Sequence, residues 1–457
     1  MNFNLNDTIA AIATPVGQGG LAIVRLSGPD AFTVADACFR PVGKSSLAPS
    51  LAPTHTIHFG KMVRQNRILD EVLLAVLHAP RTFTRENTVE ITCHGGLLPA
   101  KLVLEALLEK GARLAAPGEF TRRAFLNGRI DLAQAEAVAD LIHSRTELAL
   151  AAAHEQLAGK LSRRINLLRD DLMKTLAHIE AHIDFPDEDI APETREKLII
   201  RLQDSLVFID QLLATANEGR ILRQGLRAAI IGRPNVGKSS LLNQLLGHDR
   251  AIVSPFPGTT RDTIEETANI RGLPVVFIDT AGLRDASDAI EREGIRRSRA
   301  ALAEAELILH VLDASETLAA GDEKLLSDFA PKKRILLRNK TDLPTRLKLP
   351  SGLSAIDICC LSGKGIEELK DAIKTMVWAG ELQAGTWQVM INTRHQDALQ
   401  RTRPAIERAA HALRHNLGLE LAALDLRIAT NAVGEIVGKT TTEDLLDTIF
   451  SQFCIGK

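Results

Sequence analysis

The sequence feature that most constrains the fold is a glycine-containing loop between an apolar run and a helix-forming run. Residues 228–231 (AAII) have the composition of a buried strand, and they lead directly into Gly232-Arg-Pro-Asn-Val-Gly-Lys-Ser-Ser240. This segment matches the pattern G-x-x-x-x-G-K-S/T, and the run LLNQLL after it predicts a helix. Backbone N–H groups in such a loop, at a helix N-terminus, attract and surround phosphate groups. The sequence therefore predicts a nucleotide-binding domain with a parallel α/β sheet.

Individual residues of this loop are expected to hold particular parts of the nucleotide. Lys238 would reach the β- and γ-phosphates, and the Ser239 hydroxyl would ligate Mg²⁺. The alternative is a plain glycine turn, which the flanking strand and helix argue against. The predicted nucleotide-binding residues of the loop are Asn235, Val236, Gly237, Lys238, Ser239 and Ser240.

Two further motifs would complete the phosphate and metal site. The apolar run 275–278 (VVFI) ends in Asp279-Thr-Ala-Gly282. Asp279 would hold Mg²⁺ through its water shell, and Gly282 would offer its N–H to the γ-phosphate. Residues 258–262 (GTTRD) contain a switch threonine, Thr260, for the same metal and phosphate. The predicted direct protein ligands of Mg²⁺ are therefore Ser239 and Thr260.

A fourth motif predicts which base is bound. Residues 339–342 (NKTD) follow an apolar run, and Asp342 would accept hydrogen bonds from N1–H and the exocyclic amine of guanine. Adenine would present an acceptor and no amine to that carboxylate, and leaving a buried carboxylate unpaired is costly. We therefore predict that Asn339, Lys340 and Asp342 bind GTP and reject ATP.

These four motifs together resemble those of the translation-factor-like P-loop GTPases, over about residues 222–376. The fifth motif of that group, Ser-Ala-Lys, falls here at Cys359-Cys360-Leu361, by alignment on the glycines that follow. The Cys360 backbone N–H could still contact guanine O6, so Cys359 and Cys360 are included among the predicted GTP-binding residues. We interpret the cysteine pair as structural rather than redox-active.

The motifs do not name the residue that orients the attacking water. Ras-like enzymes use a glutamine immediately after the glycine of Asp-Thr-Ala-Gly. That position is Leu283 here, which cannot hydrogen-bond a water. The amide oxygen of Asn235 could ligate a monovalent cation beside the β–γ bridge, where an arginine finger would otherwise supply charge. The acidic residues that could orient the water are Asp285, Asp288, Glu291 and Glu293, and their spacing does not choose among them.

The rest of the chain separates into an α+β segment and helical segments. Residues 1–118 mix short β-like runs with one helical stretch, Leu97–Lys110, which predicts an α+β domain. Apolar residues at helical spacing predict helices at 161–183 and 198–216, and the composition is again typical of helices at 407–424 and 443–450. We therefore predict an α/β domain inserted into a helical domain, with the segments 1–118, 119–221 (helical), 222–378 (α/β) and 379–457 (helical).

The composition excludes a collagen-like, a disordered or a histone-like protein. The formal net charge is −2, so no strong field attracts nucleic acid or membrane, and 4% aromatic residues without tyrosine supply few stacking surfaces for bases. The five cysteines form no Cys-x-x-Cys pair, which argues against a zinc site or a disulfide framework. The sequence shows neither a leader pattern nor a run long enough to span a membrane, so we expect a cytoplasmic protein.

Further motifs extend the resemblance to the whole chain. They are DTIAAIATP at 7–15, IVRLSG at 23–28, PGEFTRRAFLNGRIDLAQAEAVADLI at 117–142 and CIGK at 454–457. Together with the GTPase motifs, they resemble the MnmE (TrmE) family of bacterial tRNA-modification GTPases. The resemblance implies a multidomain α/β protein with an α+β folate-binding N-terminal domain, an all-α helical domain and an inserted Ras-like P-loop GTPase domain whose sheet is mostly parallel.

The resemblance implies a one-carbon site and assigns residues to it. The N-terminal domain should form a homodimer and bind 5-formyl- or 5,10-methylene-tetrahydrofolate, with site residues Arg25, Glu90, Arg129 and Lys457. Some members carry lysine where this chain has Arg129, so the charge is kept and the contact geometry differs. Cys454 is the family's candidate for a catalytic or substrate-contacting thiol; the alternative is a positional role.

In the GTPase segment the resemblance assigns a potassium site and a catalytic acid. The K⁺ loop maps to Asn235, Ser254, Phe256 and Thr259, of which Ser254 and Thr259 would also contact GTP. The catalytic glutamate falls on Glu291. The implied mechanism is K⁺-dependent dimerisation of two GTPase domains, with GTP hydrolysis driving a conformational cycle.

The reaction implied by the resemblance is tRNA modification with a partner. An aminomethyl or carboxymethylaminomethyl group is installed on C5 of the wobble uridine, with ammonium or glycine as the second substrate. The FAD- and NADH-using protein MnmG (GidA) is the implied partner, in a heterotetramer or larger complex, and this chain lacks a G-x-G-x-x-G of its own. The alternatives are a ribosome-assembly or translational GTPase, and a folate-dependent methyltransferase with a vestigial GTPase domain.

One local charge excess bears on the partners. Residues 392–416 contain five arginines against Asp397 and Glu407, an excess of three positive charges. We hypothesise that this predicted helix faces tRNA or the partner protein, and a solvated helical face is the alternative.

Overall fold

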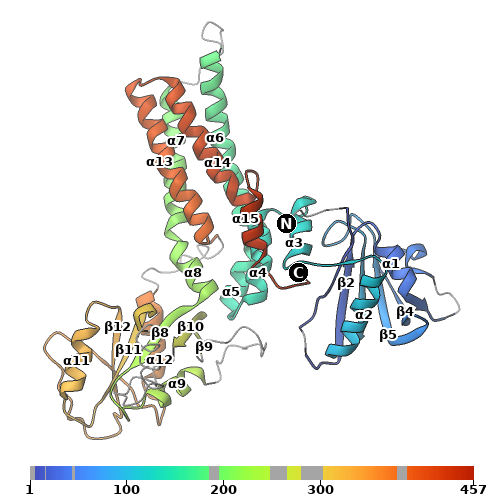
Figure 1. Cartoon of the computed structure of the whole chain (residues 1–457). Helices are drawn as coiled ribbons and strands as arrows, with labels where there is room; N and C mark the ends of the chain where they lie inside the picture. The colour runs from blue at the N-terminus through green and yellow to red at the C-terminus, as the bar shows by residue number, and fades with distance from the viewer. Residues whose placement is uncertain are drawn as a thin grey trace, which may run out of the picture. The chain divides into compact units, whose positions relative to one another are not determined.

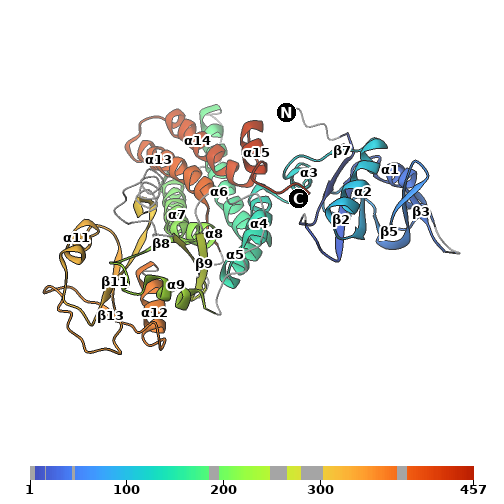
Figure 2. The ribbon, with the colours of Figure 1, turned by 60° about the horizontal axis from the view of Figure 1, so that its bottom comes forward.

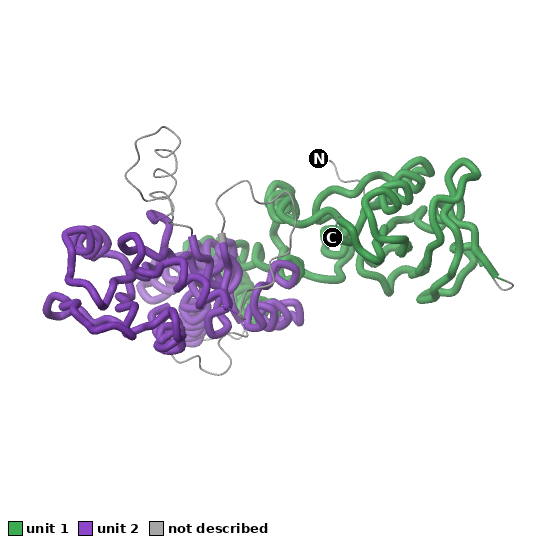
Figure 3. Tube along the Cα trace, turned by 90° about the horizontal axis from the view of Figure 1, so that it is seen from below, with its two compact units in different colours: residues 1–139, 162–190, 418–457 green, residues 140–161, 191–417 purple. Residues whose placement is uncertain are grey.

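The structure is a computed structural model that describes residues 6–15, 17–43, 47–184, 195–247, 265–278, 302–377 and 389–456. Its chain forms two compact units, drawn in different colours in Figure 3. The first unit comprises Met1–Ala139, Ser162–Ile190 and Gly418–Lys457, and the second comprises Asp140–Leu161 and Ala191–Leu417. Each unit therefore combines segments that are far apart in the sequence.

The first unit contains a seven-stranded sheet with the order β3-β4-β5-β6-β2-β1-β7. Neighbouring strands are antiparallel except β1 and β7, which are parallel. The strands are β1 (Ile9–Ile12), β2 (Leu21–Ser27), β3 (Phe39–Pro41), β4 (Thr56–Arg64), β5 (Arg67–Leu77), β6 (Thr88–His94) and β7 (Arg113–Leu114).

The two faces of this sheet differ because successive strand residues point to opposite sides. Helices α1 (Ala31–Cys38) and α2 (Leu97–Glu109) cover one face (Figure 1), where Leu74 and Ile91 pack in the same core as Val103. The other face carries exposed apolar residues, including Phe59 and Leu73, which are direct neighbours on β4 and β5. The predicted α+β fold of this part is confirmed.

The helices of the first unit come from three stretches of chain. They are α3 (Glu119–Leu126), most of α4 (Leu132–His143) and α6 (Lys160–Asp184), α14 (Leu419–Val437) and α15 (Glu443–Phe450). Phe450 of α15 packs in one apolar cluster with Leu132 and Ala135 of α4. The chain therefore returns to its N-terminal half at its end. The apolar positions that predicted α6, from Leu161 to Ile179, are buried.

The second unit contains a six-stranded sheet with the order β13-β12-β11-β8-β10-β9. All neighbouring pairs are parallel except β9 and β10. The strands are β8 (Leu226–Ile231), β9 (Glu265–Ile270), β10 (Leu273–Ile278), β11 (Leu307–Asp313), β12 (Arg334–Asn339) and β13 (Ile356–Asp357). The helices are α5 (Glu147–Leu157), α7 (Arg195–Ala214), α8 (Ala216–Gln224), α9 (Lys238–Leu246), α11 (Ala320–Asp328), α12 (Ile366–Val377) and α13 (Thr393–His415).

The central strand β8 is buried on both faces, as expected for a parallel sheet covered by helices. Helices α9 and α12 lie on one side of the sheet (Figure 2), where Ile230 belongs to the same apolar cluster as Leu241 of α9 and Leu369 of α12. Ile231 packs on the other side in a cluster that Leu325 of α11 joins. The predicted P-loop fold with a mostly parallel sheet is confirmed.

Two stretches that were predicted to be helical each contain a break between two helices. The stretch 407–424 belongs to two helices, because Asn416 takes a left-handed conformation (φ +60°) that ends α13, and α14 starts after Gly418 (φ +105°). The stretch 198–216 is also divided, since α7 ends at Ala214 and the Thr215 hydroxyl donates to the Leu212 carbonyl at 2.8 Å. Within the described residues, none of the helices is both long and apolar enough to cross a membrane.

Candidate nucleotide site and carboxyl-terminal site

The phosphate loop connects β8 to α9, and its glycines are required by close contacts. Gly232 has φ +147°, and a Cβ there would lie 2.3 Å from the Val311 carbonyl oxygen. Gly237 has φ +104°, and a Cβ there would lie 2.2 Å from Asn339 Nδ2. A side chain at Gly232 would displace the Val311 backbone, and one at Gly237 would displace Asn339 of the NKTD motif. The loop is therefore built against the ends of β11 and β12.

The groups predicted to hold phosphates lie at the start of α9. Lys238 Nζ donates to the carbonyl oxygens of Gly232 at 2.9 Å and Arg233 at 2.7 Å, which tethers the side chain across its own loop. Ser239, Ser240 and Asn235 lie at least partly exposed at this loop, where a ligand could reach them. Asn235 has φ +63°, a left-handed conformation that asparagine tolerates better than most residues.

Asn339 joins three of the predicted motifs. Its Nδ2 donates to the carbonyl oxygen of Val236 in the phosphate loop at 2.8 Å. Its Oδ1 accepts from the backbone N–H of Cys360 at 3.1 Å. The structure thus brings the phosphate loop, the NKTD motif and the Cys359-Cys360 segment together, although they are more than a hundred residues apart at the widest.

Lys340 and Asp342 flank this junction. Lys340 forms an ion pair with the buried carboxylate of Asp313. Burial raises the pKa of Asp313, but hydrogen bonds from Lys340 and Ser315 more than offset it, so the pKa lies below its usual range. Asp342 is exposed, and its Oδ1 accepts a hydrogen bond from Cys359 Sγ at 3.2 Å. Both cysteines are buried free thiols.

Several predicted residues lie outside the described part of the chain. They are Ser254, Phe256, Thr259, Thr260, Asp279, Gly282, Glu291 and Lys457. Of the predicted metal ligands, the structure therefore describes Asn235 for K⁺ and Ser239 for Mg²⁺. An amide oxygen and a hydroxyl, both accessible at the phosphate loop, are oxygen donors that suit these hard cations.

Sequence reasoning missed an ion-pair cluster behind the phosphate loop. Arg233 Nε lies 2.7 Å from Asp322 Oδ2, and its Nη2 lies 2.8 Å from Glu316 Oε2. Asp322 is 2% exposed, so this arginine compensates a buried charge. No signal could have found it, because Arg233 occupies a position that the loop pattern leaves free.

The C-terminal segment lies against the N-terminal sheet of the first unit. Arg25 Nε donates to Glu90 Oε1 at 2.8 Å, and its Nη1 donates to the carbonyl oxygen of Gly456 at 3.3 Å. Gly456 has φ +94°, and a Cβ there would lie 2.5 Å from the Ile12 carbonyl oxygen. The Gly118 N–H donates to the Cys454 carbonyl oxygen at 3.3 Å. Three predicted site elements, Arg25, Glu90 and the CIGK segment, are thus neighbours.

Arg129 lies near an apolar cluster of the first unit that contains Ile9, Ala11, Ala115 and Phe120. Its guanidinium stands 5.0 Å from the centre of the Phe83 ring, and Phe83 packs in the cluster that contains Phe120. The Arg25 guanidinium stands 5.6 Å from the centre of the Phe120 ring. Burial and the neighbouring Arg85 lower the pKa of Arg129. Two cations therefore flank one aromatic cluster.

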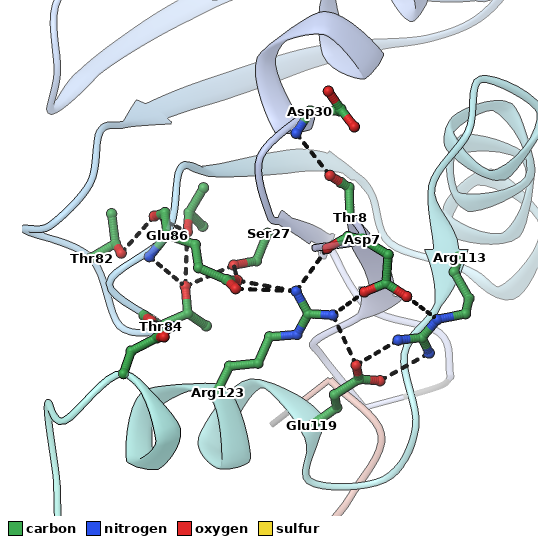
Figure 4. A network of polar contacts seen from close by, with 12 residues as sticks. Asp7, Thr8, Ser27, Asp30, Thr82, Thr84, Glu86, Arg113, Glu119 and Arg123 are labelled. Carbon is green, nitrogen blue, oxygen red and sulfur yellow. Dashed lines mark hydrogen bonds and ion pairs between the residues drawn. The ribbon is translucent and has the colours of Figure 1, made fainter. Parts of the chain in front are cut away.

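A buried charge network holds α3 to this sheet (Figure 4). Arg123 is 2% exposed and forms ion pairs with Glu119 at 3.0 Å, with Glu86 at 3.1 Å and with Asp7. Arg113 pairs with Asp7 and Glu119 as well. The network fixes α3, which carries Phe120. Because the Phe120 ring faces Arg25, the network also positions the site formed by Arg25, Glu90 and the CIGK segment.

Two protein-family models match this chain. A model described as the GTP-binding protein TrmE N-terminus matches residues 8–129, and one described as the MnmE helical domain matches residues 132–454. A "tRNA modification GTPase MnmE" from Geobacillus thermodenitrificans is 48% identical over 99% of this chain and 99% of its own length. A protein of the same name from Bacillus velezensis is 46% identical over 99% of this chain and 100% of its own. The chain belongs to the MnmE family of tRNA modification GTPases.

The resemblance to the MnmE family that the motifs predicted is thereby confirmed. Among solved structures, a point variant of Era from Aquifex aeolicus, bound to GDP and AlF4⁻, is 28% identical over 39% of this chain and 66% of that chain. Its TM-score of 0.27 is too low to support an inference.

The arginines of 392–416 lie on α13 of this MnmE-family chain, as predicted. Arg403 pairs with Asp210 of α7 at 2.7 Å and with Glu407 at 2.7 Å, and Arg401 pairs with Asp397 at 3.0 Å. These pairs are solvent-exposed, so the helix face is charged but partly neutralised. Its contact with tRNA or a partner stays a prediction.

Proposed function

We propose that this chain is a K⁺-dependent GTPase that uses a tetrahydrofolate one-carbon unit to modify C5 of the tRNA wobble uridine, together with an FAD-dependent partner of the MnmG type. The observation that carries the GTPase part is Asn339, whose amide joins the phosphate loop to the cysteine segment. This junction puts the groups for phosphate and for base at one edge of a parallel sheet, as nucleotide sites require.

The residues predicted for the nucleotide site have the following proposed roles. The phosphate-loop N–H groups and Lys238 bind the phosphates, Ser239 ligates Mg²⁺, and the Asp342 carboxylate accepts from guanine. Asn235 holds K⁺ together with Ser254, Phe256 and Thr259, and this cation would supply positive charge beside the β–γ bridge. Glu291 orients the water, and Thr260, Asp279 and Gly282 complete the phosphate and metal contacts.

The proposed one-carbon site is the region around Arg25 and Glu90. Bound tetrahydrofolate would supply the carbon. Arg25, Arg129 and Lys457 offer cations for its carboxylates, and Glu90 offers an acceptor for N–H groups of the pterin. The docking of Gly456 beside Arg25 supports this assignment, since Gly456 belongs to the same C-terminal segment as Cys454, whose carbonyl oxygen accepts from the Gly118 N–H. Cys454 is proposed either to contact the substrate or to position the segment.

The proposed partners follow from the family and from one surface. The N-terminal sheet leaves Leu21, Ile57, Phe59 and Leu73 between 47% and 69% exposed on the face opposite its helices. An apolar sheet face of this kind favours burial against another protein, which supports the proposed homodimer. We also propose a cytoplasmic location and a complex with the MnmG-type partner and tRNA.

Two experiments test the proposal. Mass spectrometry of wobble uridines in a deletion strain should show loss of the modification, with rescue by the wild-type gene and not by Lys238→Ala. Unchanged nucleosides would favour a ribosome-assembly or translational GTPase instead. GTP turnover near zero in KCl, with Lys238→Ala still functional, would favour a folate-dependent methyltransferase.

A further inference from the structure

Two exposed arginines of the first unit, Arg85 and Arg129, are each bound to the segment of chain that carries the other. Arg85 Nη1 donates to the carbonyl oxygen of Asn127 at 3.0 Å, and Arg129 Nη1 donates to the carbonyl oxygen of Thr82 at 2.9 Å. These two bonds hold the loop after β5 against the turn after α3. Burial and the neighbouring charge of Arg85 lower the pKa of Arg129, so the two guanidinium groups repel each other.

The positive charge of this pair is not balanced by acidic side chains. In the part of the chain that the structure describes, neither guanidinium forms an ion pair with a carboxylate. The adjacent acidic residue, Glu86, pairs with Arg123 instead, at 3.1 Å. Arg85 also has φ +59°, a left-handed conformation that few residues other than glycine and asparagine adopt. Neighbouring like charges on a strained loop indicate a site for an anion.

The groups that lead to this pair follow the order of the parts of a reduced folate. Glu90, an acceptor, is bound to Arg25, whose guanidinium stands 5.6 Å from the centre of the Phe120 ring. Phe83 packs in the cluster that contains Phe120, and the Arg129 guanidinium stands 5.0 Å from the centre of the Phe83 ring. Tetrahydrofolate has N–H donors on its pterin, then an aromatic ring, then the carboxylates of glutamate. The arginine pair therefore lies at the end of the series where the glutamate would be.

We propose that Arg85 and Arg129 bind the γ-linked glutamate tail of the folate, and that the chain prefers a folate with several glutamates to the monoglutamate. This inference rests on the proposed one-carbon function. Arg129 binds the first glutamate, and Arg85 binds a carboxylate further along the tail. Because both arginines are exposed, each ion pair is weak, and we expect a preference of roughly 3- to 10-fold for a tetraglutamate tail. The preference should decrease as the salt concentration rises.

The test compares 5-formyl-tetrahydrofolate with a monoglutamate tail and with a tetraglutamate tail. The dissociation constants are measured by calorimetry on the full-length chain, at low and at high salt. Arg85→Asn removes the charge and keeps a residue that tolerates the left-handed conformation, whereas Arg85→Lys keeps the charge. Arg67→Asn is the matched control, because it removes the same charge from an exposed position at the start of β5, whereas the loop of Arg85 follows the end of that strand.

We expect Arg85→Asn to bind the tetraglutamate form about as weakly as the monoglutamate form, with the affinity for the monoglutamate little changed. Arg85→Lys should restore most of the preference, and Arg67→Asn should keep it. A wild-type chain that binds both forms equally, or an Arg85→Asn chain that keeps the preference, would overturn the tail site and leave the one-carbon function in place. Loss of tRNA binding by Arg85→Asn without a change in either folate affinity would overturn it in favour of an RNA phosphate. A wild-type chain that binds neither form would overturn the one-carbon function together with this inference.

Discussion

Removing the guanidinium of Arg123 should destabilise the N-terminal sheet of this MnmE-family chain. The arginine is 2% exposed and faces three carboxylates, those of Asp7, Glu86 and Glu119. Arg123→Met keeps an apolar side chain of similar length and removes all of these ion pairs. Asp7 and Glu119 would then keep their ion pairs with Arg113, whereas Glu86 would lose its ion pair with Arg123.

The magnitude follows from how buried each carboxylate is. Breaking a buried ion pair by removing one partner costs about 3–5 kcal/mol. Asp7 and Glu86 are 27% and 13% exposed, and Glu119 keeps Arg113, so the lower end applies. We expect the free energy of unfolding to fall by about 3 kcal/mol. The equilibrium constant for opening of this part of the structure would then rise roughly a hundredfold.

The loss should depend on pH. Burial raises the pKa of Asp7 and of Glu119, but hydrogen bonds from Arg113 and Arg123 more than offset it, so both pKa values lie below their usual range. A carboxyl group with a lowered folded-state pKa contributes stability above its unfolded pKa and loses it as the pH falls through the folded value. The difference in the free energy of unfolding between wild type and Arg123→Met should therefore have its full value at pH 7 and become smaller below about pH 4.

Hydrogen exchange of peptides from β1 and β2 is the suitable assay, because the chain has no tyrosine and its two tryptophans, at 378 and 387, are not part of the sequence that forms this sheet. Arg64→Met is the matched control: it removes an arginine from a partly exposed pairing with Glu105 and Glu109 in the same unit, and protection should hardly change. If Arg123→Met lowered protection by less than about threefold at pH 7, the argument from buried charge would be refuted.

Three further outcomes are expected. GTP hydrolysis should be faster in KCl than in NaCl at equal ionic strength if Asn235 holds K⁺, and equal rates would remove the cation from the mechanism. Glu291→Ala should slow single-turnover hydrolysis by roughly 100-fold or more with GTP affinity little changed, whereas a large loss of affinity would make Glu291 a structural residue. Gly456→Ala should raise the dissociation constant of 5-formyl-tetrahydrofolate in calorimetry, because a Cβ would strike the Ile12 carbonyl at a φ of +94°. Gly43→Ala, also at positive φ but with open space around it, should leave that constant unchanged.

What could be predicted from the sequence depended on whether the structural cause is local. The phosphate loop, its strand and its helix could be predicted because the glycine pattern and the apolar runs lie close together in the chain, within residues 228–246. The break between the end of α13 and the start of α14 was not predicted, although Asn416 and Gly418 both favour helix ends, since the residues on both sides of it are typical of helices.

Contacts between distant segments could not be predicted from any pattern. Arg25 and Gly456 are 431 residues apart, and Asn339 and Val236 are 103 apart. Each of these bonds joins a side chain to a backbone carbonyl, and a carbonyl carries no sequence signal. The family resemblance indicated which residues matter, whereas the structure shows how Arg25, Glu90 and Gly456 come to be neighbours.

The nucleotide-binding sheet also shares its core with residues outside the predicted GTPase segment. Ala149 of α5 and Met390 are buried in the same apolar cluster as Ile230, and Leu148 packs against Gly272 beside β9. Arg145 Nη1 donates to the buried Thr267 hydroxyl of β9 at 2.7 Å. Residues 222–378 alone would therefore expose part of this core and lose a polar anchor of β9. In the sequence, β9 directly follows the segment that carries Thr259 and Thr260. Measurements of GTP hydrolysis on the full chain therefore test the site with these supporting contacts in place, whereas measurements on an excised domain would test it without them.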